Sequence, residues 1–262
     1  MYDLLEYIKL NRNLKNTSMV GREQESTMIK MRAFKRAEGM TLRRYFLERN
    51  SYFIVKRCFD ILFSLLVIVF VLSWLLPLLA LVIRLDSRGP VFFIQKRVGF
   101  LGRSFYCIKL RTMCVNPEAN TLQARENDPR VTKFGRFLRK SNLDELPQFL
   151  NVLAGHMSVI GPRPHMHEDC RAFSQMVASY KFRNILKPGI SGLAQIKGYR
   201  GPADSFDKVF KRYQWDAFYV RNASFSLDMR IIRETIVQTL GYLKPSRSVL
   251  EVEPRHPALS SI

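Results

Sequence analysis

Several common signatures of catalysis are missing from this 262-residue chain. Its four cysteines form no C-x-x-C pair, which argues against a zinc ribbon and a disulfide framework, so we expect reduced cysteines in a cytosol-facing chain. No G-x-x-x-x-G-K-[ST], G-x-G-x-x-G or H-E-x-x-H occurs, which excludes the P-loop, dinucleotide-binding and zincin motifs. No Asp-x-Asp pair is present either, so the metal site found in many nucleotide-sugar enzymes is not expected.

Acidic residues are scarce, with 22 Asp and Glu against 42 Lys and Arg and a net charge of +20. Such a charge predicts an anionic partner, which is a nucleic acid, an anionic membrane face or a phosphate-bearing substrate. No helix-turn-helix, zinc or RNA-recognition signature occurs, so we expect no nucleic-acid partner. A membrane-anchored nucleic-acid-binding or scaffold protein remains the rival interpretation.

One long apolar run is present, at residues 61–83, with 23 residues and no charge. As a helix it spans about 35 Å, enough to cross a hydrocarbon core of roughly 30 Å. It begins too far along the chain for a signal peptide. Basic residues flank both of its ends, namely Lys56, Arg57, Arg84 and Arg88. Because positive charge favours the cytoplasmic side, both ends are drawn to that side.

Two topologies fit this apolar run. A helix that enters the membrane, breaks and returns places both basic ends in the cytoplasm, whereas a kinked single span places one of them outside. Pro77 removes a backbone donor, and the hydroxyl of Ser73, four residues earlier, can satisfy a backbone group that Pro77 leaves free. We therefore predict the membrane break at Ser73 and Pro77.

The rest of the chain predicts an α+β, mostly helical fold. Residues 1–52 form a basic N-terminal extension, in which 40–50 is either an amphipathic surface helix or a loosely ordered arm. Strands are expected in 91–95, 103–113 and 157–164, and a polar loop at 116–129. Helices are expected in five segments, and 189–201 is expected to be a glycine-rich loop. The five segments are 131–142, 143–155, 167–186, 205–220 and 226–243, and a tail follows at 243–262.

Two adjacent carboxylates, Asp144 and Glu145, stand out in the basic chain. Neighbours on a helix do not share a face, so they do not match the facing carboxyl groups of a glycosidase. One interpretation is that they begin a helix, complement its dipole and cap it, with Pro147 in the first turn. The other is chemical, in which one carboxylate attacks phosphorus and the other holds Mg²⁺.

Basic side chains nearby favour the chemical interpretation. Arg139 and Lys140 can form an anion pocket beside the acids, and "GPRP" holds Arg163 between two prolines for forked phosphate contacts. His165 and His167 form an H-x-H motif, which is either half of a metal site or a pair of surface or phosphate-facing imidazoles.

These residues resemble a known family. The matching blocks run in order over about residues 53–242 and include "KRCFDILFSLL", "DSRGPVFFIQKRVG", "DPRVTKFGRFLRKSNLDELPQFLNVLAGHMSVIGPRP" and "KPGISGLAQIKGYRG". The chain is similar to the bacterial sugar transferases, which are monotopic polyprenyl-phosphate hexose-1-phosphate (phosphoglycosyl) transferases. The resemblance implies a re-entrant membrane helix at 53–86, broken near a Ser-Pro step, although here Trp74 follows Ser73. It also implies a small cytosolic catalytic domain at 87–242 with amphipathic interfacial helices, on the cytoplasmic face of the bacterial inner membrane.

The resemblance also implies a reaction. Asp144 would attack the β-phosphate of a UDP-sugar, expel UMP and carry the sugar phosphate until a polyprenyl phosphate takes it, as the initiating step of exopolysaccharide, capsule, O-antigen or glycoprotein glycan assembly. Glu145 would bind Mg²⁺. The expected partners are the UDP-sugar, polyprenyl (undecaprenyl) phosphate and anionic membrane lipids, and a homodimer is left open. The rival is a phosphotransferase that uses Asp144 without a covalent step. The substrate-binding residues implied are Lys109, Arg111, Arg139, Arg163, Asp216 and Arg200, the last in "KGYR" where relatives often carry Asn-Gly-Arg.

Overall fold

The computed structural model describes residues 42–116, 128–177, 179–203 and 205–243. The chain divides into two compact units, which meet between Ile54 and Val55. In the first unit residues 42–48 are helical, and the aromatic rings of Phe46 and Phe53 lie 5.0 Å apart. This matches the amphipathic-helix alternative for 40–50. The remainder of the predicted extension and the predicted C-terminal tail beyond residue 243 lie outside the described residues.

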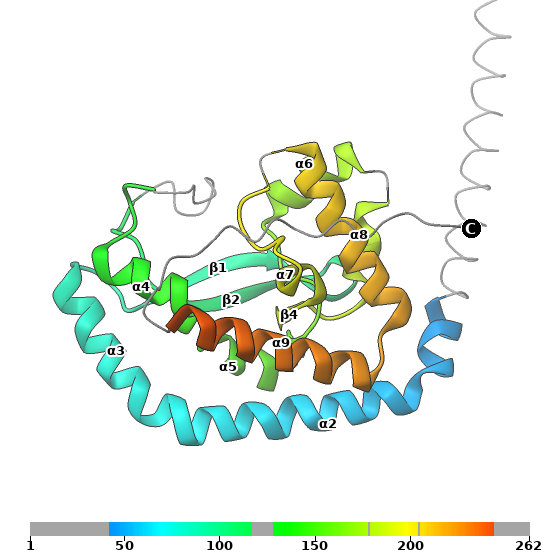
Figure 1. Ribbon diagram of the computed structural model, residues 1–262, viewed down its shortest axis with the longest axis horizontal. Coiled ribbons are helices and arrows are strands. Elements are labelled where there is room, and N and C mark those ends of the chain that lie inside the picture. Colours follow the sequence, from blue (N-terminus) through cyan, green and yellow to red (C-terminus); the bar gives the residue numbers. More distant parts are fainter. Residues whose placement is uncertain (1–41, 117–127, 178, 204, 244–262) are drawn as a thin grey trace, which may run out of the picture. The chain divides into compact units, whose positions relative to one another are not determined.

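The second unit is mostly helical with two small sheets, which confirms the predicted class (Figure 1). Its helices, in chain order, are α2 (Asn50–Val67, which begins in the first unit), α3 (Ser73–Asp86), α4 (Lys133–Ser141), α5 (Gln148–Leu153), α6 (His167–Met176), α7 (Leu193–Ile196), α8 (Phe206–Asn222) and α9 (Phe225–Leu243). Its strands are β1 (Phe92–Val98), β2 (Ser104–Leu110), β3 (Ser158–Ile160) and β4 (Gly189–Ser191).

The apolar run lies in one continuous helix of 37 residues, Asn50–Asp86. Its mean hydropathy reaches 3.0 and only 17% of its most apolar stretch is buried in the protein, so by length and composition it is able to cross a membrane. Large apolar side chains are exposed along its length. They are Ile54, Val55, Leu62, Leu65, Leu66, Val69, Phe70, Trp74, Leu78, Leu81 and Leu85.

The expected break is a bend rather than an interruption. A π-helical segment, Ile68–Leu72, joins α2 to α3, and the helix axis changes direction there (Figure 1). Wide π turns are a known cause of bends. The Ser73 hydroxyl donates to the Val69 carbonyl at 2.6 Å, so it supports the turn before it rather than the group that Pro77 leaves free. The predicted role of Ser73, to satisfy a backbone group that Pro77 leaves free, is therefore wrong, because its hydroxyl bonds to Val69 instead.

The two sheets position the segments around the functional site. β1 and β2 form an antiparallel hairpin in which Phe92 pairs with Leu110 and Val98 with Ser104. β3 and β4 are parallel and very short. The segment 189–201, expected to be a loop, instead holds β4 and α7. Glycine is needed at Gly189 because a Cβ there would lie 2.0 Å from the backbone nitrogen of Gly161.

Two apolar clusters hold the second unit together. One joins α3, β2 and α4 through Leu79, Ile83, Leu110 and Leu138. The other joins β1, α6, the 3-10 segment Tyr180–Ile185 and α8, through Val98, Cys170, Phe173, Val177, Tyr180 and Val209. The predicted helix 167–186 is thus two helical pieces, since Val177 is extended and closes α6.

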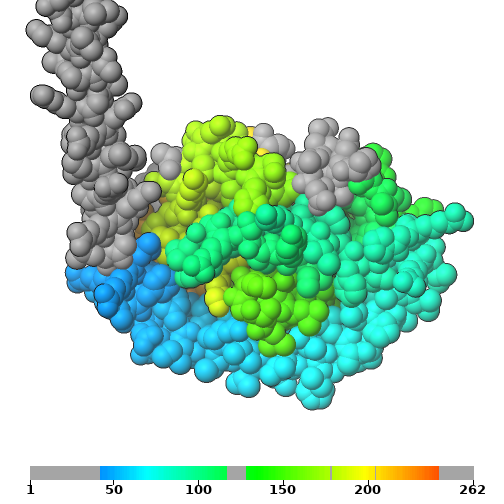
Figure 2. All heavy atoms as spheres, turned by 180° about the vertical axis from the view of Figure 1, so that it is seen from behind, coloured from blue at the N-terminus to red at the C-terminus, as the bar shows by residue number. Residues whose placement is uncertain are grey.

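The second unit grips both halves of the bent helix. On α2, Lys56 donates to Asp228 of α9 at 2.8 Å, and Asp60 accepts from the Val159 nitrogen at 2.9 Å. At the far end of α3, Arg111 donates to the Ser87 carbonyl at 2.7 Å. Figure 2 views the molecule from behind, and there the bent helix of α2 and α3 follows one edge of the visible face, beside the α5 segment. Residues of both halves therefore contact the same unit.

Candidate active site

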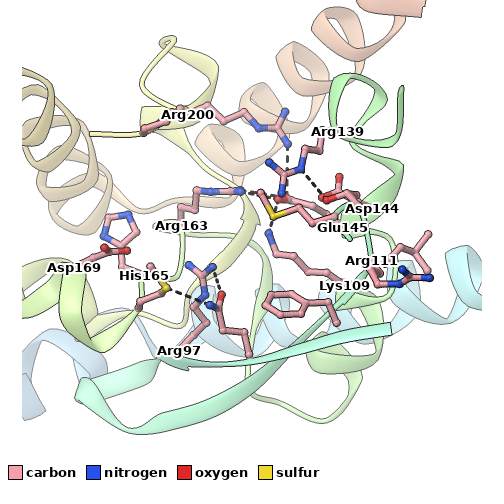
Figure 3. A pocket seen from close by; sticks show the side chains of 18 of the residues that line it. Arg97, Lys109, Arg111, Arg139, Asp144, Glu145, Arg163, His165, Asp169 and Arg200 are labelled. Atoms are coloured by element: carbon pink, nitrogen blue, oxygen red, sulfur yellow. Dashed lines mark hydrogen bonds and ion pairs between the residues drawn. The ribbon is translucent and has the colours of Figure 1, made fainter. Parts of the chain in front are cut away.

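A cavity of 1060 Å³ opens between the β1–β2 hairpin, the turn 143–145, the segment 163–169, the loop 198–202 and α8. Basic side chains, among them Lys109, Arg139, Arg163 and Arg200, gather around Glu145 in its wall (Figure 3). Apolar side chains of β1 and of the segment after β2 line other parts of the wall. The predicted residues that line it are Lys109, Arg111, Arg139, Asp144, Glu145, Arg163 and Arg200. The structure thus gathers seven candidates that are up to 91 positions apart in the chain.

Both carboxylates lie in a 3-10 turn, Leu143–Glu145, that follows α4. Asn142, at φ 61, ends α4 in the left-handed region and redirects the chain, while Leu143 packs against the α3–β2–α4 cluster. Asp144 is 8% exposed and Glu145 4%. The helix-start interpretation is confirmed in part, because both acids lie in the 3-10 turn that begins this helical segment. The capping role is wrong, because neither carboxylate caps this turn or α5, which begins at Gln148.

Glu145 is surrounded by three cations from three elements. Its Oε1 accepts from Lys109 of β2 at 2.9 Å and from Arg163 at 2.6 Å, and its Oε2 lies 3.2 Å from Arg163 Nη1. Arg200 Nη2 approaches the same Oε2 to 3.6 Å. Burial by itself raises the pKa of Glu145, but Arg163 and Lys109 outweigh it and hold that pKa well below its usual range.

Asp144 has the opposite electrostatic setting. Burial raises its pKa to about 6, and the neighbouring charge of Glu145 adds to the effect, while Lys109 and Arg139 oppose it. Two adjacent acids are therefore separated in acidity by their surroundings. Such a separation is typical of sites in which two carboxylates have different chemical roles.

Arg163 reaches Glu145 because a buried pair supports its backbone. Arg183 donates to the Arg163 carbonyl at 2.6 Å and binds Asp216 at 2.8 Å. Asp216 is 1% exposed and does not line the cavity, so the structure does not bring this predicted substrate residue to the site. Its carboxylate instead forms an ion pair with Arg183.

Two other predicted residues differ from expectation in what their side chains contact. Arg111 lines the cavity, yet its guanidinium binds the Ser87 and Pro90 carbonyls at the end of α3, at 2.7 and 2.5 Å, and points away from Glu145 (Figure 3). Arg139 lines the cavity and donates to Thr112 at 2.8 Å. Lys140 is exposed and outside the lining, so only Arg139 contributes to the predicted anion pocket.

The H-x-H motif does not act as a pair. His165 is buried in the cavity wall, where burial and the charge of Arg183 hold its pKa well below the usual range. His167 opens α6 and bonds to Ser104 at 2.9 Å. Within the part of the chain that the structure describes, no group of three or more His, Cys, Asp or Glu residues could hold a metal ion.

Sequence reasoning missed three arginines around the cavity, of which Arg183 and Arg212 are buried and Arg97 is half-buried. Arg97 and Arg212 line the cavity and Arg183 lies behind it. The signal that could have revealed Arg212 is its spacing, because it shares the buried face of α8 with Val209 and Asp216. An arginine on the inner face of an amphipathic helix must find buried partners, and these are described below.

Carboxylate oxygens are suitable ligands for Mg²⁺, and the dyad supplies them. Both oxygens of Glu145, however, are engaged by Arg163, with Lys109 and Arg200 beside them. A Mg²⁺ ion would therefore have to compete with these cations for the Glu145 carboxylate and would need further oxygen ligands, such as those of a phosphate. One or two carboxylates with substrate phosphates are its common protein environment.

Comparisons with known proteins show a family match over most of the chain. The family model described as bacterial sugar transferase matches residues 51–242. A UDP-glucose:undecaprenyl-phosphate glucose-1-phosphate transferase of Xanthomonas campestris pv. campestris is 42% identical over 207 residues, covering 77% of this chain and 42% of that protein. The protein of the same name from Escherichia coli (strain K12) is 43% identical over 184 residues, covering 70% of this chain and 39% of that protein.

A shorter relative matches over nearly its whole length. The exopolysaccharide production protein PSS of Rhizobium leguminosarum bv. phaseoli is 44% identical over 192 residues, which cover 71% of this chain and 96% of that protein. By contrast, the chain spans about two fifths of the length of the first curated relatives that it matches.

Proposed function

The chain belongs to the bacterial sugar transferase family, and from this premise we propose that it transfers a sugar 1-phosphate from a UDP-sugar to a polyprenyl phosphate at the membrane. The observation that carries the proposal is the dyad, in which a buried Asp144 with a raised pKa lies beside Glu145 and its three cations. A basic cavity of 1060 Å³ beside a carboxylate suits a nucleoside diphosphate sugar.

In the first half-reaction, a carboxylate oxygen of Asp144 attacks the β-phosphorus of the UDP-sugar. A bond forms between this oxygen and phosphorus, and the bond from the β-phosphorus to the bridging oxygen breaks, so UMP leaves with that oxygen and its electron pair. Lys109, Arg139, Arg163 and Arg200 face the place where this charge develops, and their role is to neutralise it.

In the second half-reaction, an oxygen of the polyprenyl phosphate attacks the same phosphorus. The bond to Asp144 breaks, its carboxylate is restored, and the product is a polyprenyl diphosphate sugar. A covalent intermediate allows a soluble donor and a lipid acceptor to use one small site in turn.

We include Mg²⁺ in the proposal as a partner of the donor diphosphate. When bound, it supplies neutralisation of phosphate charge, and Glu145 with Asp144 would hold it. The role of this chain's cations is then to turn from Glu145 toward the phosphate oxygens as the donor enters.

The bent helix supports a monotopic arrangement. Lys56 and Asp60 of α2 are bonded to α9 and to the start of β3, and Leu79 and Ile83 of α3 pack on β2 and α4. Because one catalytic unit contacts both halves, we propose that both ends of the helix lie on its side of the membrane. The site would then lie at the level of the lipid headgroups, on the cytoplasmic face.

The relatives' names suggest which donors to test first. Several act on UDP-glucose, and a relative from Aeromonas hydrophila is a UDP-N-acetylgalactosamine-undecaprenyl-phosphate N-acetylgalactosaminephosphotransferase. We propose a hexose or N-acetylated hexose donor, and a role at the start of a surface polysaccharide.

The test is UMP release by the purified chain from a panel of UDP-sugars, with undecaprenyl phosphate and Mg²⁺ present. We expect UMP to be released from at least one donor, with formation of a lipid diphosphate sugar, and Asp144→Asn to abolish it. Strong salt-dependent binding to DNA or RNA without any UMP release would favour the scaffold rival.

A further inference from the structure

The loop that carries Arg200 follows α7, and the Gly198 and Tyr199 amides donate to the Gln195 and Ala194 carbonyls at 3.1 and 3.0 Å. Gly198 has φ +90 and Gly201 follows Arg200, and a Cβ at either glycine would meet no atom within 4 Å. Glycines in open space leave the backbone free to take several conformations. Arg200 is itself 37% exposed and reaches Glu145 only to 3.6 Å. The bonds to α7 involve residues before Arg200, whereas α8 supplies contacts on both sides of it.

Arg212, a buried arginine of α8, donates hydrogen bonds to this loop on both sides of Arg200. Arg212 is 5% exposed, its Nε donates to the Tyr199 carbonyl at 3.0 Å, and its Nη2 donates to the Gly201 carbonyl. A planar guanidinium is suited to such a two-point contact, because its donors are fixed relative to one another. The one side chain thus bridges the residues immediately before and after Arg200.

The remaining guanidinium nitrogen of Arg212, Nη1, faces the neutral ring of His165. Its Nη1 lies 3.5 Å from Nε2 of His165, whose other ring nitrogen is 2.8 Å from the Tyr180 hydroxyl. Since His165 is buried among arginines, it stays uncharged and does not repel Arg212. Arg212 thus contacts two carbonyls and a neutral ring, and both of its charged hydrogen bonds go to backbone.

We propose that Arg212 is a positioning residue that clamps the 199–201 backbone and so holds Arg200 over the cavity beside Glu145. The inference rests on the proposed function, because it assigns Arg200 a task in binding the donor diphosphate. It predicts that removing the clamp affects catalysis through Arg200 and not through a direct contact with substrate.

The main variant is Arg212→Lys, which keeps the charge but cannot bridge two carbonyls. We expect kcat/KM for the UDP-sugar to fall about 10- to 100-fold, since misplacing a contact by an ångström is enough for such losses. Arg200→Ala should give a loss of the same size. The matched control is Lys211→Gln, a neighbouring exposed residue of the same helix paired with Asp207, which should leave kcat/KM unchanged.

The decisive comparison is the double variant. If Arg212 acts through Arg200, then Arg212→Lys in the Arg200→Ala background should lower kcat/KM less than twofold further. Full multiplication of the two losses would overturn the clamp, because it would mean that Arg212 acts independently.

Hydrogen exchange gives a second readout that does not depend on activity. Arg212→Lys should speed amide exchange at residues 199–201 about tenfold or more while amides of α8 exchange as in the parent. Unchanged exchange at 199–201, or a general increase across α8, would contradict the proposal. If the parent chain releases no UMP from any donor, the proposed function fails, and the exchange result still decides the clamp.

Discussion

Nη2 of Arg163 lies 2.6 Å from Oε1 of Glu145, although 18 positions separate the two residues in the chain. The contact exists because Pro162 and Pro164 flank Arg163, and Arg183 holds its carbonyl from behind. Glu145 thereby keeps several cations at the place where a diphosphate would bind. In the free protein, the Glu145 carboxylate would thus stand in for part of the negative charge of the proposed diphosphate substrate.

Glu145→Gln should disable this arrangement in a diagnostic way. We expect UMP release to fall about 10²- to 10³-fold, because the cations lose the charge that orders them. The pKa of Asp144 should also fall, since the charge of Glu145 contributes to raising it. The pH profile of the residual activity checks this, and its acidic limb should shift to lower pH. Glu168→Gln, on an exposed glutamate, is the matched control. An unshifted limb would contradict the electrostatic account.

The parent enzyme should lose activity in mild acid. Asp144 must be a carboxylate to attack phosphorus, and its pKa is raised to about 6. We therefore expect kcat/KM for the donor to be level above pH 7 and to fall as pH decreases through about 6, approaching tenfold per pH unit. The sign follows from the deprotonated form being the reactive one. A profile that stays flat down to pH 5 would be inconsistent with this role.

Asp216 should prove to be a stability residue. Asp216→Asn leaves the guanidinium of Arg183 buried without a counter-charge, a change that costs about 3 kcal/mol or more in comparable cases. Thermal unfolding of the detergent-solubilised variant should show a lower midpoint, whereas KM for the donor, measured on the folded fraction, should change little. Asp207→Asn, in the exposed pair with Lys211, should leave the midpoint unchanged. A stable variant with a greatly raised KM would restore Asp216 as a substrate residue.

Metal binding should require the donor. Because Arg163, Lys109 and Arg200 surround the Glu145 carboxylate, we expect no measurable Mn²⁺ binding to the free protein by electron paramagnetic resonance. Adding UDP should produce a bound Mn²⁺ signal that Glu145→Gln weakens. Tight binding of Mn²⁺ to the free chain would show that Arg163, Lys109 and Arg200 do not prevent metal binding to Glu145.

Topology can be checked with two engineered thiols. Ser51→Cys and Arg88→Cys lie at opposite ends of the bent helix, and the exposed Cys58 and Cys114 are replaced by serine in the background. We expect an impermeant maleimide to label neither in intact cells and both after permeabilisation. Labelling of one position alone in intact cells would establish a straight span.

Local patterns predicted the elements well. The aromatic and branched residues of β1 and β2, the basic segment of α4, and the periodic apolar faces of α8 and α9 predict the observed segments within a few residues. The basic residues at both ends of the apolar run predicted that both ends lie on the cytoplasmic side, and this stays a prediction. The structure adds that Lys56 bonds to α9 and that Arg111 bonds to the end of α3, so both halves contact one unit.

The sequence does not predict which charged side chains form ion pairs with one another. Asp216 and Glu145 are both acids among arginines, yet one is paired behind the site and the other lines the cavity. Position in the chain does not distinguish them, because Arg183 and Arg163 reach them from distant segments. The same limit applies to Arg212, whose partners are backbone carbonyls that any sequence would supply.

The central claim is that Asp144 carries the sugar phosphate, and the most direct measurement omits the lipid acceptor. The purified chain is incubated with Mg²⁺ and a UDP-sugar labelled in the sugar, then denatured and digested. The account predicts a burst of at most one UMP per chain, with the label on the peptide that contains Asp144 and none in Asp144→Asn. Turnover with lipid but no labelled peptide without it, or a label that persists in Asp144→Asn, would contradict the account.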